Sequence, residues 1–278
     1  MSNTVLQPEK PIEGVGLLSD LSIQNHPIEG FLDYAEHAVQ PTELILVPGS
    51  HHQRTIKQRF AQADKPTDTV VFSSIEDIAT DLQVEEGIEP TSRLDRADRL
   101  ALLERVVETD ETLCAQLALS LGVTPAVAIE TVERARAAVE SMTGYHPERI
   151  GAIREWCRRR EGPTADDCLN LVDGVVGLER ELRQQTAHAT SSEMQLRRAI
   201  RLLSQRGSQL WMDAYPSIER LWVCGLTAPP ASLCDFLGVA AAVTDAQVHL
   251  GARPVSGELI WSRIDTVCDI SDPGTEVI

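Results

Sequence analysis

The feature that most constrains this fold is a repeated pairing of a short, wholly apolar segment with a helical pattern. Residues 43–47 (ELILV) and 69–72 (TVVF) contain apolar runs without the alternation that marks a strand exposed on one face. Such runs are typical of strands buried on both faces of a parallel sheet. Helical patterns follow at 52–60 and 75–82, so we expect an α/β fold in which helices cover a parallel sheet.

The same signal returns near the end of the chain after a long interval. Residues 220–224 and 247–250 have the pattern of two more buried strands, separated by a short helix over 232–242. From 91 to 205 the pattern is helical, with five or six segments separated by turns. We therefore expect the α/β core to be interrupted by an all-α insertion.

These patterns divide the chain into four parts. In order, we expect a mobile N-terminal arm at 1–24, the first part of the α/β core at 25–90, the helical insertion at 91–205 and the second part of the core at 206–278. A first helix is expected over 27–39. Residues 261–268 fit either a strand or a helix.

The charge composition indicates an unusual environment. The formal net charge is −17, and the basic residues are 22 arginines and only three lysines. An acidic, lysine-poor surface is typical of a halophilic protein in a very salty cytoplasm, where screening makes a large net charge tolerable. A GC-rich genome, which also favours arginine over lysine, is the alternative explanation. In the high-salt interpretation, acidity does not exclude nucleic-acid binding.

The cysteines and the hydropathy pattern bear on the cellular compartment. The six cysteines form no Cys-x-x-Cys pair, and no histidine lies at zinc-finger spacing from them. The first residues lack the basic start and apolar stretch of a signal peptide, and no run of about 18 apolar residues could span a bilayer. We therefore expect a soluble, cytoplasmic protein with reduced cysteines and no membrane contact.

The turns after the predicted strands are the candidate binding crevice, because ligands of an open parallel sheet bind outside the carboxyl ends of its strands. Ser50, and either Ser73 or Ser74, are also the expected caps of the helices that follow. The crevice residues are Gly49, Ser50, Ser73, Ser74, Gly225 and Thr227.

These turns lack the residues of the common catalytic motifs. A phosphate-binding loop needs a glycine-rich turn that ends in Lys-Ser/Thr, but none of the three lysines follows a glycine. The sequence also has no Gly-x-Gly-x-x-Gly, no acidic strand-end pair for magnesium, no Gly-x-Ser-x-Gly and no nuclease carboxylate cluster with a lysine. We therefore expect no catalytic residue, no metal and no cofactor, and a function in binding.

His51, His52 and Arg54 follow directly after the first apolar run. At a helix N-terminus, such side chains and the free backbone N–H groups are suited to contact a phosphate or a partner. Two histidines also suggest a metal site or a general base, but no Asp, Glu or Cys accompanies them at metal spacing. Ordinary surface positions are the third interpretation.

A second candidate contact surface is a basic stretch in the predicted insertion. Residues 149–206 hold eleven arginines against eight acidic residues, and some of these arginines lie one helical turn apart. The candidate nucleic-acid contact strip consists of Arg154, Arg158, Arg159, Arg197 and Arg201. Ion pairing within and between helices is the alternative. Few aromatic residues lie among the arginines, so no stacking platform for single strands is expected.

Several of these segments resemble a known protein family. Residues 44–54 (LILVPGSHHQR), 69–79 (TVVFSSIEDIA), 94–104 (LDRADRLALLE) and 218–227 (IERLWVCGLT) are similar to the N-terminal region of the B subunit of AddAB/RexAB-type helicase–nucleases. The resemblance covers most of residues 28–250 and rests on loose patterns of strand plus helix. It implies a P-loop-type, superfamily I helicase-like core with a helical insertion.

The same resemblance implies a role in the processing of double-stranded DNA ends, and it would place His51, His52 and Arg54 near single-stranded DNA. The nucleotide-binding loop expected before residue 28 is missing, and 278 residues leave no room for the rest of the helicase core and the nuclease domain. The leading hypothesis is an inactivated, non-catalytic helicase-like subunit that docks on a helicase or nuclease partner in DNA repair, recombination or defence, with possible direct contact to DNA. The alternatives are a stand-alone α/β protein–protein interaction module and an unrecognised enzyme that uses His51, His52 or Cys224.

Overall fold

The structure is a computed structural model. It describes residues 21–24, 32, 40–89, 91–124, 128–160, 162–188, 191–225, 228–251, 260, 262, 264 and 270–278. The helix predicted over 27–39 and the ambiguous segment 261–268 lie almost wholly outside these residues. Most of the predicted N-terminal arm lies outside them as well.

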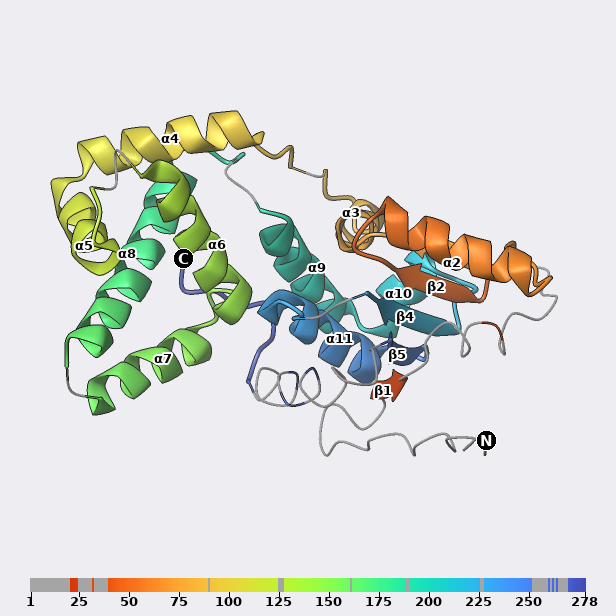
Figure 1. The fold of residues 1–278 in the computed structure, drawn as a ribbon. Coiled ribbons are helices and arrows are strands. Elements are labelled where there is room, and N and C mark those ends of the chain that lie inside the picture. Colours follow the sequence, from red (N-terminus) through yellow and green to blue (C-terminus); the bar gives the residue numbers. More distant parts are fainter. Residues whose placement is uncertain are drawn as a thin grey trace, which may run out of the picture.

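A parallel sheet of five strands forms the centre of the α/β part, in the order β1-β5-β4-β2-β3 (Figure 1). The strands are β1 (Leu21–Gln24), β2 (Glu43–Leu46), β3 (Val70–Ser73), β4 (Arg220–Cys224) and β5 (Gln247–Gly251). The predicted fold class is thereby confirmed. The arm prediction is wrong for residues 21–24, where LSIQ alternates apolar and polar residues and so lacks the continuous apolar run that marks a buried strand.

Helices account for most of the remaining described chain. They are α2 (Ser50–Gln62), α3 (Ile75–Glu85), α4 (Arg96–Thr109), α5 (Glu111–Leu121), α6 (Ile129–Thr143), α7 (Pro147–Arg159), α8 (Pro163–Gln185), α9 (Ser192–Arg206), α10 (Ser208–Ala214) and α11 (Ala231–Val243). The short helix α10 was not predicted. Ser50 is the first residue of α2 rather than its cap. The cap position is Gly49, which has no side chain to accept a hydrogen bond.

Helices cover both faces of the sheet. On one face, Ile56 and Phe60 of α2 pack with Ile45 and Trp222 of the central strands. On the other face, α3, α9, α10 and α11 enclose a larger core. The chain therefore leaves β2 toward one face and leaves β4 toward the other, which opens a crevice between the carboxyl ends of these two neighbouring strands.

Helices α4 to α8, which we call the helical unit, form a second core of their own at one end of the molecule (Figure 1). Helix α9 does not belong to this core, although its residues fall in the predicted insertion. Its Leu196, Ile200 and Leu203 are buried against the sheet side of the molecule. The C-terminal residues Val277 and Ile278 pack against the helical unit, so the end of the described chain joins the two parts.

The described cysteines are free, and Cys157, Cys224 and Cys234 are buried. Cys268 lies outside the described residues. Within the described part of the chain, no helix combines the length and the apolar character needed to cross a membrane.

Candidate functional site

The structure brings the ends of β2 and β4 together at the carboxyl edge of the sheet. Gly225, directly after β4, has φ +78°, a left-handed conformation that favours glycine. A Cβ atom at this position would lie 3.0 Å from Cδ2 of His52 and 3.2 Å from Cδ of Pro48. The ring of His52 therefore lies against the Gly225 backbone, so the turns after β2 and β4 are in contact.

Ser73 is the last residue of β3, and Ser74 is the N-cap of α3. The Ser74 hydroxyl accepts a hydrogen bond from the backbone N–H of Asp77, and the Asp77 carboxylate accepts one from the Ser74 backbone N–H. Of the two predicted caps, Ser74 is the actual one. Ser73 donates to the Ser74 carbonyl oxygen at 3.2 Å. Thr227 lies outside the described residues.

A pocket of about 400 Å³ lies beside this edge, where the N-terminal turns of α3, α9 and α11 meet Val47 and Pro48. Glu193 is one of its polar wall residues, and its carboxylate accepts a hydrogen bond from the Ser232 hydroxyl at 3.3 Å. Burial raises the pKa of Glu193 to about 7, and the nearby carboxylate of Glu140 acts in the same direction.

The other carboxylate of the pocket belongs to Glu76, and it is already neutralised. Both guanidinium nitrogens of Arg93 bind its oxygens, at 2.8 and 2.5 Å, and the Ser192 hydroxyl donates to it at 2.6 Å. The hydrogen bond from Arg93 holds the pKa of Glu76 below its ordinary value. The sequence pattern does not single out Glu76, Ser192 or Glu193, because residues 76 and 192 meet only through the tertiary fold.

Helix α2 presents the most distinctive surface of this edge. Among the described helices, it alone combines basic residues with no Asp or Glu. Arg54, Lys57 and Arg59 are exposed, as are His51 and His52 at its first turn. Lys57 lies 5.1 Å from the centre of the Phe72 ring, and none of the three cations forms an ion pair with a described residue. A basic surface left unneutralised in a chain of net charge −17 is suited to bind a polyanion.

The predicted arginine strip does not form one surface. Arg154 is partly buried and pairs with Asp173 of α8, with 2.6 Å between the nearest nitrogen and oxygen. Arg158 and Arg159 are exposed at the end of α7, where both contact Glu155, at 3.9 and 3.1 Å. The other two members lie on α9, so the five arginines belong to two separate helices.

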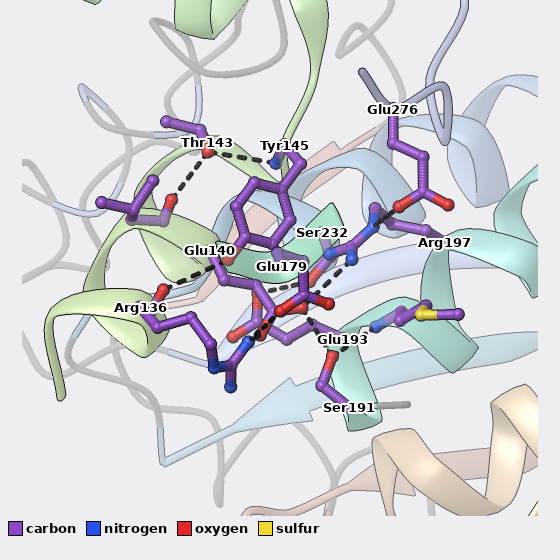
Figure 2. A network of polar contacts seen from close by, with 12 residues as sticks. Arg136, Glu140, Thr143, Tyr145, Glu179, Ser191, Glu193, Arg197, Ser232 and Glu276 are labelled. Carbon is purple, nitrogen blue, oxygen red and sulfur yellow. Dashed lines mark hydrogen bonds and ion pairs between the residues drawn. The ribbon is translucent and has the colours of Figure 1, made fainter. Parts of the chain in front are cut away.

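Arg197 is the clearest departure from the prediction, because only 1% of its surface is exposed. Its guanidinium pairs with Glu140 of α6 at 3.1 Å and with Glu276 of the C-terminal segment at 3.2 Å, as Figure 2 shows. Although burial opposes ionisation, Arg197 and Arg136 hold the pKa of Glu140 below its ordinary value. Arg201 donates to the Gly274 carbonyl oxygen at 2.8 Å. Arg197 is therefore a structural cation and not part of a contact strip.

Among the described residues, no group of three or more His, Cys, Asp or Glu side chains has the arrangement of a metal site. His51 and His52 lie with their ring centres 6.2 Å apart, and neither has an acidic hydrogen-bond partner among the described residues. The edge of the sheet thus offers a basic helix, a close contact between the turns after β2 and β4, and a mainly apolar pocket with two carboxylates in its wall, which are features of a binding surface.

The comparisons with known proteins agree with a helicase-related fold. A family model described as a halobacterial UvrD-like protein matches residues 16–278, which include the sheet, the helical unit and the C-terminal segment. No curated protein matches the chain.

Proposed function

The chain belongs to the halobacterial UvrD-like family, a helicase-related family, and we propose that it is a non-catalytic, helicase-like protein that binds DNA through α2. The observation that carries the proposal is the basic, acid-free surface of α2, with His51, Arg54, Lys57 and Arg59 exposed. A strongly acidic protein repels DNA over most of its surface, so binding requires a local area of opposite charge. The N-terminal N–H groups of α2 add a second feature that favours phosphate.

The lysines support the non-catalytic part of the proposal. Phosphate-loop chemistry uses a lysine at the start of a helix, after a glycine-rich turn. Lys57 lies in α2, and Lys65 follows that helix. Helix α2 comes after β2, which β5 and β4 separate from β1 in the sheet. Lys10 precedes β1 in the sequence. The residues after β1, from Asn25 to Phe31, contain no lysine. ATP hydrolysis by the pure protein, above that of a mock preparation, would overturn this part.

We further propose that the protein acts in the cytoplasm of a high-salt cell, beside a helicase or nuclease partner in DNA repair, recombination or defence. The name of the family and the lysine-poor composition support the first part. A helicase-like protein without its own phosphate loop would need a partner to drive DNA unwinding with ATP, which supports the second. Affinity purification from cells at native salt tests it, with an AddAB/RexAB-type helicase or nuclease subunit as the expected partner.

DNA binding is tested by fluorescence anisotropy with labelled single-stranded and duplex DNA over a range of potassium chloride concentrations. The test variant is Arg54→Glu/Arg59→Glu. The matched control is Arg96→Glu/Arg105→Glu, which reverses two exposed arginines of α4 and changes the net charge equally. We expect the test variant alone to lose affinity. Its slope of log K against log salt should fall by roughly 0.7 to 0.9 per lost phosphate contact.

The same measurement also separates the alternatives. If the wild-type protein binds neither DNA form, α2 is not a DNA surface and the interaction-module interpretation gains weight. If both double variants lose affinity equally, net charge alone explains the effect and the assignment to α2 fails.

A further inference from the structure

The last turn of α7 carries an exposed tryptophan next to three consecutive arginines. Trp156 is 49% exposed, whereas Trp211 and Trp222 are buried. The Arg160 guanidinium carbon lies 4.4 Å from the centre of the Trp156 ring. An arginine stacked on an indole is a cation–π pair, and it orders the ring without removing it from solvent.

The charge around this ring is positive. Among the described residues, the carboxylate of Glu155 contacts both Arg158 and Arg159. Residues 155–161 hold three arginines against Glu155 and Glu161, so this segment keeps a formal charge of +1. The side chains of Arg158 and Arg159 remain 62% and 75% exposed, so their charge is available to a ligand.

The position of α7 makes this tip separate from the sheet edge. Ile150 and Cys157 are the buried side of the helix, which packs on α8, and Trp156 lies on the other side. Figure 1 shows α7 in the helical unit, whereas α2 lies on the opposite side of the molecule, over the sheet. Cations in a last helical turn also complement the helix dipole, but that effect does not account for a half-exposed indole ring.

We propose that the tip of α7 is a second nucleic-acid contact, in which an unpaired base stacks on Trp156 while Arg158 and Arg159 contact the flanking phosphates. The proposal rests on the proposed function, since it names single-stranded DNA as the ligand class. A stacked base needs an aromatic surface beside positive charge, and the described exposed residues of α7 provide both. The small number of aromatic residues among the arginines predicts no such platform, because a count of residues does not show which ring is exposed.

In the proposed high-salt cytoplasm, stacking contributes more to DNA binding relative to ionic contacts. Ionic contacts to phosphate weaken as salt rises, since the release of counterions into a concentrated solution gains less entropy. Stacking of a base on an aromatic ring has no such dependence. A protein with this net charge that binds DNA in molar potassium chloride therefore needs contacts of the kind that Trp156 offers.

The test compares Trp156→Ala and Trp156→Phe with the wild-type protein on a single-stranded oligonucleotide and on a blunt duplex. We expect Trp156→Ala to weaken single-strand binding about tenfold, to leave duplex binding unchanged and to leave the salt slope unchanged. Trp156→Phe should retain most of the affinity, since a benzene ring also stacks. Arg158→Glu/Arg159→Glu should instead lower the salt slope by about one to two.

The outcomes distinguish this inference from the proposed function. If Arg54→Glu/Arg59→Glu weakens DNA binding but Trp156→Ala does not, the α2 surface stands and the α7 contact is overturned. Equal losses of affinity for the single strand and for the duplex in Trp156→Ala would also overturn it. So would a Trp156→Ala variant that keeps its DNA affinity but no longer binds a protein partner. If the wild-type protein binds no DNA, both proposals fail. Circular dichroism checks that each variant is folded. We expect the Trp156 variants to fold because this side chain is half exposed.

Discussion

Replacement of Glu193 by glutamine should stabilise the protein, and the gain should depend on pH. Burial raises the pKa of this carboxyl group from its ordinary 4.5 to about 7. The folded state therefore holds a proton that the unfolded state releases between these two pH values. By linkage, the wild-type protein loses stability as pH rises through this window, and above it the fold carries a charged, poorly solvated carboxylate.

The size of the effect follows from the same shift. One pKa unit corresponds to about 1.4 kcal/mol, so the wild-type protein loses up to about 3 kcal/mol near pH 8 and under about 1 kcal/mol near pH 5. Glutamine has the same shape and carries no charge, and its amide oxygen can still accept the hydrogen bond from Ser232. The gain of Glu193→Gln over the wild type should therefore grow from pH 5 to pH 8.

Urea unfolding at constant potassium chloride measures this difference, since the midpoint and slope give the free energy of unfolding at each pH. The matched control is Glu111→Gln, an exposed acid in the first turn of α5. It measures how much the favourable interaction of a first-turn carboxylate with the helix dipole contributes to stability. A gain for Glu193→Gln that is the same near pH 5 and pH 8, or no larger than that of the control, would refute the reasoning.

Two further predictions follow from the ion pairs and the crevice. Arg197→Met should cost about 3 to 5 kcal/mol because it leaves the buried Glu140 without its cation, and adding Glu140→Gln should recover part of the loss in urea unfolding. Gly225→Ala should cost about 1 to 3 kcal/mol and displace His52, whereas Gly122→Ala, also at positive φ but with open space around it, should show the backbone strain alone. Equal costs at the two glycines would contradict the contact between Gly225 and His52.

Most of the sheet was predictable because its inner strands are almost wholly buried. The inner strands at 43–46, 220–224 and 247–251 each have at most one residue that is not buried, and the edge strand at 70–73 still contains an apolar run. The strand at 21–24 (LSIQ) is the other edge strand, and its apolar and polar residues alternate. Local pattern therefore identified the three inner strands and one edge strand, and missed the edge strand without an apolar run.

The candidate site was only half predictable. The turns after β2 and β4 were located because the carboxyl edge of a parallel sheet is a general binding position. The pocket walls were not, since Glu76 and Ser192 are 116 residues apart and meet only through packing. The same limit explains Arg197. A helical spacing shows which side chains share a face, but it does not show whether that face is turned toward solvent or toward a second carboxylate-rich helix.

The distribution of the arginines fits the proposed high-salt cytoplasm. Salt screens exposed ion pairs strongly and buried pairs much less, so a protein in such a medium gains little from surface pairs. Arg136 and Arg197 lie in buried pairs with Glu179 and Glu140 that connect α6 to α8 and to α9. The cations of α2 stay exposed without an ion pair to a described residue, and those of α7 stay exposed beside the half-exposed ring of Trp156. That is why the DNA-binding proposals rest on these two helices and not on the arginine content of the chain.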